Sequence, residues 1–324
     1  MSHPRHPNLS PGKASALLAL AFLPLLLAVP ALEAGGSPQS SATTLECDAI
    51  SSQILGRAVE YCVALPADYA ASAPARYPAL YFLHGLFESA RSWSDRGGKQ
   101  TLDDLSSRGE VGKFLVILPD GGKTFYLNSL DGRDRYEDFF LQELAPAIDA
   151  KYRTLASPAA RGISGTSMGG YGALHLAMRH PDVFGSASAH SAALLAKFPH
   201  PLPSEGRWAF YARVLAGPFG SPLNESYWQA NSPLTFAAHP ERFAGLKLYF
   251  DCGDHDRYGF AEGAQLLDRE LTAQGFPHEF ALRPGDHGWS YLNQYMKYSL
   301  QFHWRLFEQA EGKLAAAKMK GGTR

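Results

Sequence analysis

The serine at the centre of Gly165-Thr166-Ser167-Met168-Gly169 is the residue of this chain best suited to act as a nucleophile. The Gly-x-Ser-x-Gly spacing is typical of a strand-to-helix turn that holds a serine at strained backbone angles and exposes its hydroxyl. The chain packs so tightly in such a turn that positions two before and two after the serine cannot carry bulky side chains. The motif therefore predicts a serine hydrolase, and the alternative is an ordinary glycine-rich surface turn.

The residues on both sides of this turn favour the hydrolase interpretation. An apolar patch at Ala159 to Ile163 leads into the motif and is suited to a strand. After the motif, Tyr171, Leu174 and Met178 recur at helical spacing. Strand, turn and helix are the context that a nucleophilic serine of this kind requires.

Two later loops could supply the carboxylate and the histidine that such a serine needs. In this architecture the acid and then the base follow the serine along the chain. The apolar run Leu246 to Phe250 opens into the loop Asp251 to Arg257, and the run Phe280 to Leu282 opens into the loop Arg283 to Trp289. Both loops therefore begin at the carboxyl ends of expected strands, where α/β enzymes place their sites.

His287 is the predicted general base, because it lies in a Pro-Gly-Asp-His-Gly turn after a strand. It would take the proton of Ser167 during attack and return it to the leaving alcohol. His84 and His190 are weaker rivals, since neither comes after an acid loop. A surface-loop histidine with no catalytic role is the remaining alternative.

The acid loop offers three carboxylates, Asp251, Asp254 and Asp256, and their spacing does not separate them. The role requires only a carboxylate that holds the imidazole tautomer. Asp251 at the strand end also suits bracing of the turn. Asp254, His255 and Asp256 have no further clustered ligands, so we expect neither a metal nor another cofactor.

The chain resembles the esterase D family of α/β-hydrolases over about Leu45 to Phe307. This family includes S-formylglutathione hydrolases, feruloyl and acetyl xylan esterases, and mycolyltransferases. Besides the serine turn, the matching pieces are Tyr81-Phe-Leu-His-Gly-Leu86, Tyr136-Glu-Asp-Phe-Phe-Leu-Gln-Glu-Leu144, Ile148-Asp-Ala-Lys-Tyr-Arg153, Asp251-Cys-Gly-Asp-His-Asp256 and Pro284-Gly-Asp-His-Gly-Trp289.

The resemblance implies roles for particular residues. It implies Asp256 as the acid, because the family's Gly-x-x-Asp motif falls on Gly253 to Asp256, and it implies His287 as the base. It also implies an oxyanion hole formed by the backbone N–H groups of Leu86 and Met168, which would bind the negative oxygen of the tetrahedral intermediate. For the His84-Gly85 pair that precedes Leu86, the alternative is a plain turn after a strand.

Aromatic residues near the expected site are candidates for substrate binding. We select Trp93, Tyr126 and Trp289, which follow the oxyanion turn, a Pro-Asp-Gly-Gly turn and His287, respectively. Aromatic walls would suit an aryl acyl group such as ferulate. The alternative for any one ring is packing in the core, since large aromatics chiefly serve burial.

The order of expected elements predicts an α/β-hydrolase fold with a mainly parallel central sheet and helices on both faces. The catalytic domain should span residues 45–310, with a lid-like insertion at 191–240 before the acid-bearing strand. The expected elements are an N-terminal hairpin, strands at 79–83, 114–118 and 183–189, and helices at 136–152, 261–274 and from Trp289 to about Gln309. Residues 311–324 are expected to form a frayed tail.

The N-terminus predicts export. Arg5 and Lys13 precede the apolar run Ala14 to Val29, and small residues follow it, as in a secretory signal peptide. We assign residues 1–34 to the signal peptide and 35–44 to a flexible linker. An uncleaved anchor is the alternative, but the run has only about 16 residues where a span needs about 20. The expected location is secreted or periplasmic, with no stable membrane anchor after cleavage.

Export permits disulfides, and the chain has three cysteines, Cys47, Cys62 and Cys252. A hairpin centred between Ile54 and Leu55 would place Cys47 opposite Cys62, so we predict a bridge between them. Two free thiols are the alternative. Cys252, beside an expected buried strand, is then a small core residue.

The composition and the motifs together limit the function. With 45% apolar residues and 30 basic against 31 acidic residues, the chain shows no electrostatic signature of nucleic-acid binding. The favoured function is an exported carboxylesterase that acts on small-molecule or polysaccharide-linked esters, including feruloyl or acetyl esters. Alternatives are an acyltransferase to a sugar alcohol, an S-formylglutathione hydrolase, a peptidase and a non-catalytic wall-binding protein. The sequence leaves the oligomeric state open.

Overall fold

An eight-stranded sheet is the centre of the fold in this computed structural model, which describes residues 42–197 and 205–321. The strand order is β1-β2-β4-β3-β5-β6-β7-β8. The strands are β1 (Thr44–Ser52), β2 (Arg57–Leu65), β3 (Ala79–Leu83), β4 (Leu115–Pro119), β5 (Arg161–Thr166), β6 (Ser186–His190), β7 (Lys247–Gly253) and β8 (Glu279–Arg283). Strands β3 to β8 pair in parallel, and β1 and β2 add two antiparallel pairings at one edge. The predicted mainly parallel α/β sheet is confirmed.

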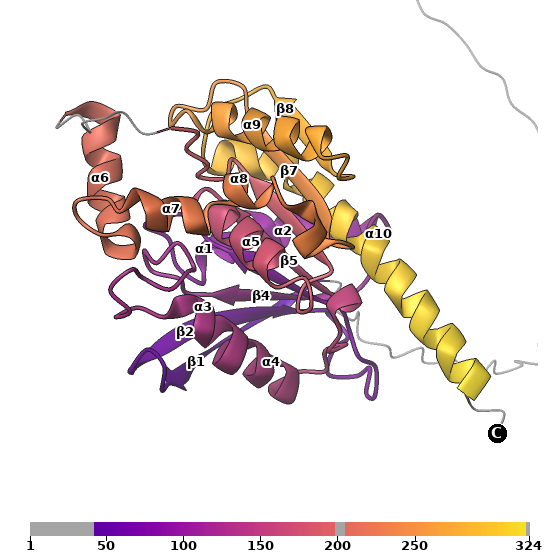
Figure 1. Cartoon of the computed structure of the whole chain (residues 1–324). Helices are drawn as coiled ribbons and strands as arrows, with labels where there is room; N and C mark the ends of the chain where they lie inside the picture. The colour runs from indigo at the N-terminus through magenta and orange to yellow at the C-terminus, as the bar shows by residue number, and fades with distance from the viewer. Residues whose placement is uncertain (1–41, 198–204, 322–324) are drawn as a thin grey trace, which may run out of the picture. The chain divides into compact units, whose positions relative to one another are not determined.

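Alternating residues of each strand face two different cores, as the two-residue period of a strand requires. In β3, Tyr81 and Leu83 belong to the larger core, whereas Leu80 and Phe82 belong to the smaller one. The larger core is covered by α3 (Tyr136–Phe139), α4 (Ala145–Lys151), α5 (Met168–Arg179) and α9 (Phe260–Ala273). Figure 1 shows α5 and the α3–α4 segment in front of the strands.

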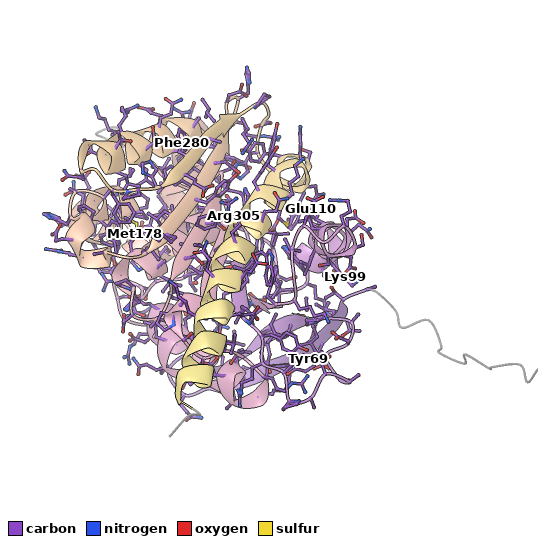
Figure 2. All side chains as sticks on the ribbon, turned by 90° about the vertical axis from the view of Figure 1, so that its right-hand side faces the viewer. Tyr69, Lys99, Glu110, Met178, Phe280 and Arg305 are labelled. Carbon is purple, nitrogen blue, oxygen red and sulfur yellow. A yellow bond between two sulfur atoms is a disulfide. The ribbon has the colours of Figure 1, made fainter. Side chains whose placement is uncertain are left out.

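The smaller core is covered by α1 (Ser92–Asp95), α2 (Gly98–Ser107) and α10 (Trp289–Gly321). Leu292, Met296 and Leu300 of α10 recur at helical spacing and are buried against this face. In Figure 2, α10 lies across the strands with α2 beside it. The loops at the carboxyl ends of the parallel strands are therefore backed by helices on both faces.

Several elements differ in their bounds from the sequence-based expectation. The helix expected at 136–152 is present, but its middle is a π-helical segment at Phe140–Leu144 between α3 and α4. The strand expected at 183–189 begins only at Ser186. The last helix does not end near Gln309 but continues through Gly312 to Gly321, because the alanine and lysine residues between 313 and 320 favour a helix.

The insertion before β7 is largely helical. It contains α6 (Gly206–Phe219), α7 (Glu225–Asn231) and α8 (Pro233–Phe236). Short 3₁₀ turns lie at Pro158–Ala160, before β5, and at Pro240–Phe243, before β7. The predicted signal peptide, residues 1–34, lies outside the described residues. Within 42–197 and 205–321, none of the helices combines the length and the apolar character needed to cross a membrane.

The N-terminal hairpin has the predicted register. Cys47 pairs with Cys62 across β1 and β2, and the two residues form a disulfide. Cys252 is a buried free cysteine. All three predictions are confirmed. The centre of the hairpin fixes which residues lie opposite each other and so explains the register and the bridge, whereas Cys252 is buried in β7.

Candidate active site

Ser167 occupies the turn between β5 and α5 with φ 56° and ψ −119°, angles that a non-glycine residue rarely adopts. Its N–H donates a hydrogen bond to His190 O at 3.0 Å, and its carbonyl accepts from Tyr171 N at 3.0 Å as α5 begins. Neighbouring main chain therefore holds the strained turn on both sides.

The glycines two residues before and after Ser167 are required by close backbone contacts. A Cβ at Gly165 would lie 2.2 Å from Gly169 O, and a Cβ at Gly169 would lie 2.0 Å from Leu83 O. Both distances are far inside van der Waals contact. The steric reason for the motif is therefore present at both positions, and α5 packs directly on β3.

A cavity of about 290 Å³ opens beside the serine turn. Five of the residues that sequence reasoning singled out line it, namely Leu86, Ser167, Met168, His287 and Trp289. They come from three separate turns, after β3, after β5 and after β8. The topology therefore places the candidate nucleophile, base and oxyanion donors around one cavity, at the carboxyl ends of parallel strands.

His287 is paired with Asp256. His287 Nδ1 lies 2.7 Å from Asp256 Oδ2, and the Asp256 side chain is fully buried. Because a carboxylate only accepts hydrogen bonds, Nδ1 carries the proton and Nε2 is left as the basic nitrogen. Asp256 Oδ1 accepts from Tyr258 N at 2.9 Å, which fixes the carboxylate in turn. This pair has the geometry that a serine hydrolase needs in its base and acid.

Each of the other two acids of the loop has a different partner. Asp251 Oδ1 accepts from His190 Nδ1 at 2.9 Å, and both side chains are fully buried. Asp254 is partly exposed and binds His255 Nδ1 and Gly285 N; these hydrogen bonds lower the pKa of its carboxyl. The structure thus separates three carboxylates that sequence spacing could not separate.

Hydrogen bonds in the turn after β3 fix the orientation of the Leu86 N–H. The carbonyl of Gly85 lies 2.7 Å from His84 Nδ1 and accepts from Glu88 N at 3.3 Å. In a trans peptide the next N–H points opposite to this carbonyl. The Leu86 N–H is therefore aimed away from His84 and Glu88 N. Met168, at the first position of α5, also has an N–H without an intrahelical partner.

His84 and Tyr126 brace this turn from below. His84 Nε2 accepts from Gly121 N at 2.9 Å, so the imidazole is neutral with its proton on Nδ1. Tyr126 donates its hydroxyl to His84 O at 3.0 Å. Burial raises the pKa of Tyr126 well above its ordinary value, which keeps the phenol protonated and able to donate. His84, a rival for the base in the sequence, is thus a structural residue.

Backbone strain is concentrated at this site. Within the described ranges, the non-glycine residues with positive φ are Phe87, Phe125, Tyr126, Ser167 and Ser191. Phe87, Phe125 and Ser167 line the cavity. Strained residues cluster where a site needs side chains in fixed directions, so this distribution supports a functional role for the cavity.

Two of the three predicted substrate-binding residues do not line the cavity. Trp93 is 1% exposed and packs against Phe82 in the smaller core, and Tyr126 is fully buried with its hydroxyl bound to His84 O in the turn after β3. Both predictions are corrected: these rings are structural. The Trp93 ring packs directly on the backbone of Gly98, where a Cβ would lie only 2.4 Å from the ring. Trp289 does line the cavity.

Several residues besides those selected individually from the sequence line the cavity, and part of them belong to the predicted insertion at 191–240. One of them is Glu88, four residues after His84. The apolar wall comes from α6 and from the acid loop, with Phe210, Tyr211, Val214, Leu215, Tyr258 and Phe260. The helical spacing of residues 210, 211, 214 and 215 is the signal that could have identified this wall. No group of three metal-binding side chains occurs among the residues that the structure describes.

The sheet order and the serine turn define an α/β-hydrolase fold. The chain belongs to the esterase family, whose model matches residues 52–302.

Esterase Rv1288 of Mycobacterium tuberculosis is 38% identical over 135 residues, which cover 40% of this chain and 28% of that protein. An endo-1,4-beta-xylanase/feruloyl esterase of Xylanibacter ruminicola is 32% identical over 114 residues, which cover 34% of this chain and 16% of that protein. These matches thus span less than a third of either relative. Among solved structures, a ferulic acid esterase is similar with a TM-score of 0.70 and 27% identity, over 82% of this chain and 99% of that one.

Proposed function

We propose that this protein is an exported serine carboxylesterase that hydrolyses acyl esters through a covalent acyl-enzyme on Ser167. The observation that carries the proposal is the cavity lined by Ser167, His287 and the two oxyanion candidates, with His287 bound to the buried Asp256. Membership of the esterase family supports the same reaction.

In the first half-reaction, His287 Nε2 takes the proton of Ser167 Oγ as that oxygen attacks the ester carbonyl carbon. The carbonyl oxygen becomes negative and is bound by the N–H groups of Leu86 and Met168. The tetrahedral intermediate then collapses, the bond to the alcohol oxygen breaks, and His287 returns its proton to the leaving alcohol. Water, deprotonated by His287, releases the acid from Ser167 in the same way.

The shape and lining of the cavity favour an acyl group with an apolar body. Its wall includes Phe125, Phe210, Val214 and Phe260, so an aromatic acyl chain would lose its contact with water there. Feruloyl or acetyl esters of polysaccharides fit this chemistry. The names of the similar solved structure and of the Xylanibacter relative support the feruloyl group.

The disulfide supports export. Bridges such as Cys47–Cys62 persist in oxidising compartments and are rare in the cytosol. This argues against S-formylglutathione hydrolysis, since glutathione thioesters are cytosolic. The proposed signal peptide at 1–34 is consistent with this location.

The test is hydrolysis of p-nitrophenyl acetate and methyl ferulate by the purified protein, beside Ser167→Ala. We expect turnover by the wild type and a loss of about 10⁶ in kcat in the variant. Ser106→Ala on α2, outside the cavity, is the matched control. A folded wild type that hydrolyses neither ester, or an equally active Ser167→Ala, would contradict the proposal. Product analysis with a sugar alcohol present separates hydrolysis from acyl transfer, and an acylated sugar would contradict the role of water.

A further inference from the structure

The carboxylate of Glu88 connects the turn after β3 to the start of α10. Its Oε2 accepts from Gly85 N at 2.9 Å, and its Oε1 accepts from Trp289 Nε1 at 2.5 Å. Gly85 directly precedes the oxyanion candidate Leu86, and Trp289 is the second residue after His287. Glu88 thus joins, with one oxygen each, two catalytic segments that are about 200 residues apart in the chain.

Only a carboxylate of this length satisfies both contacts. Two N–H donors point at the side chain, and an ionised carboxylate is the one side-chain group with two oxygens that both only accept. A glutamine would present its NH₂ to one of the two donors, and an alanine would leave both unpartnered. Hydrogen bonds from N–H groups to a charged carboxylate are also stronger than those between neutral groups.

The contact to Gly85 completes the restraint of the oxyanion turn. The carbonyl of Gly85 is already held by His84 and by the Glu88 N–H. With its N–H bound to Glu88 Oε2, both peptide groups of Gly85 are fixed, and the second of them carries the Leu86 N–H. A Cβ on Gly85 would lie 3.4 Å from Glu88 Oε2 and 3.7 Å from Ser167 Cβ. The restrained peptide therefore lies between Glu88 and the nucleophile.

We propose that Glu88 is a positioning residue that sets the oxyanion turn and the His287 loop relative to each other around Ser167. The inference rests on the proposed esterase function. Glu88 lines the cavity, but both of its oxygens already accept N–H donors, so it is not placed to exchange protons with substrate. Its effect should therefore appear in the chemical step rather than in substrate binding.

The test compares Glu88→Ala and Glu88→Gln with the wild type on p-nitrophenyl acetate. We expect kcat to fall about 10- to 100-fold in Glu88→Ala, as for a small misplacement of reacting groups, with KM changed less than about threefold. The kcat of Glu88→Gln should lie between those of the wild type and Glu88→Ala, because glutamine keeps one of the two contacts. Glu60→Gln, an exposed glutamate on β2, is the control and should match the wild type.

Trp289→Phe removes the Oε1 contact and keeps an aromatic ring at the cavity wall, so its loss in kcat should be smaller than that of Glu88→Ala, and the two losses should not add in the double variant. The indole N–H resonance of Trp289 should move upfield in Glu88→Ala, which reports the contact without activity. A kcat within about twofold of the wild type, or a change confined to KM, would overturn the inference. If the wild type itself were inactive, the proposed function would fail, while an unchanged indole resonance in Glu88→Ala would independently refute the contact.

Discussion

Asp251 Oδ1 accepts a hydrogen bond from His190 Nδ1 at 2.9 Å, in a part of the sheet that solvent does not reach. Tyr249 and Tyr291 donate to the same carboxylate, and His190 Nε2 lies 2.7 Å from Ser299 Oγ. A serine, a histidine and an aspartate are thus linked by buried hydrogen bonds, and none of the three lines the cavity. This buried set links β6, β7 and α10, and it leaves Asp256 as the acid that faces His287.

The three acids of the loop should therefore respond differently to substitution by asparagine. Asp256→Asn should lower kcat by about 10⁴, because the amide favours the wrong tautomer of His287. Asp254→Asn, which is partly exposed and outside the cavity, should change kcat by less than about twofold. Initial rates on p-nitrophenyl acetate check both, and equal losses in the two variants would argue against the assignment of Asp256.

Asp251→Asn is the structural counterpart of this comparison. It removes the charge from a buried carboxylate that accepts from His190 and from two tyrosine hydroxyls, so the free energy of unfolding should fall by about 3 to 5 kcal/mol. Urea unfolding followed by fluorescence measures this loss. A variant as stable as the wild type would mean that the buried network contributes little.

Sequence reasoning worked where geometry is local. The serine turn depends on contacts among neighbouring residues, with Gly165 and Gly169 packed against backbone, and the Cys47–Cys62 bridge depends on the register of one hairpin. Choosing among three aspartates was different, because Asp251, Asp254 and Asp256 differ in which distant histidine or amide each meets. Family resemblance could select Asp256, whereas spacing could not.

The aromatic residues show the same limit. Trp93 and Tyr126 follow turns at the edge of the site, and only tertiary packing directs their rings into the cores. The role of Glu88 could not be predicted locally, because its second partner, Trp289, lies 201 residues further along the chain. Burial and long-range partners depend on the whole fold, so single-sequence patterns carry little information about them.

Gly169→Ala should prevent stable folding of the serine turn. The new Cβ would lie 2.0 Å from Leu83 O, and backbone on both sides leaves no room for it to move. We expect a loss of about 3 kcal/mol or more in the free energy of unfolding. Gly312→Ala on α10 is the matched control: nothing lies within 4 Å of its Cβ position, so the variant should gain about 0.5–1 kcal/mol. Thermal unfolding of both variants measures the contrast.

His303 should make stability depend on pH. Its ring nitrogens lie 2.8 Å and 2.9 Å from the hydroxyls of Ser186 and Ser188. Burial, with a contribution from the charge of His190, lowers the pKa of His303 to about 3. This pKa is below that of His303 in the unfolded state, so the unfolded state takes up the proton at a higher pH than the folded state does. The contribution of His303 to stability is therefore fully present above a pH of about 6.5 and is lost as the pH falls below that value.

When the pH is lowered from 7 to 5, His303 should therefore lower the free energy of unfolding by about 2 kcal/mol. Urea titrations at the two pH values measure the difference. His303→Gln, which retains hydrogen-bonding groups but does not titrate, should show a smaller dependence by that amount. An identical pH dependence in the variant would exclude His303 as its source.

The hairpin disulfide should stabilise the fold without affecting the reaction. It closes a loop with a sequence separation of 15 residues, and removal of such a bridge costs about 3 kcal/mol in the chain-entropy model. Cys47→Ala/Cys62→Ala should lose that amount in urea unfolding and keep the kcat of the wild type at 25 °C, since β1 and β2 contribute nothing to the lining of the cavity. A large loss of kcat in the folded variant would show that the hairpin reaches the site in another way.

The wall formed by α6 should set the size of the acyl group. Val214 lines the cavity, whereas Arg213, which precedes it in α6, is exposed. Val214→Phe would fill space that an aromatic acyl group needs, so kcat/KM for methyl ferulate should fall about 10- to 100-fold, with p-nitrophenyl acetate changed less than about threefold. Arg213→Phe adds the same ring outside the cavity and should leave both rates near those of the wild type. Equal losses on the two esters in Val214→Phe would instead mean that α6 affects the reacting groups themselves, and the acyl pocket would then have to be sought elsewhere along the cavity.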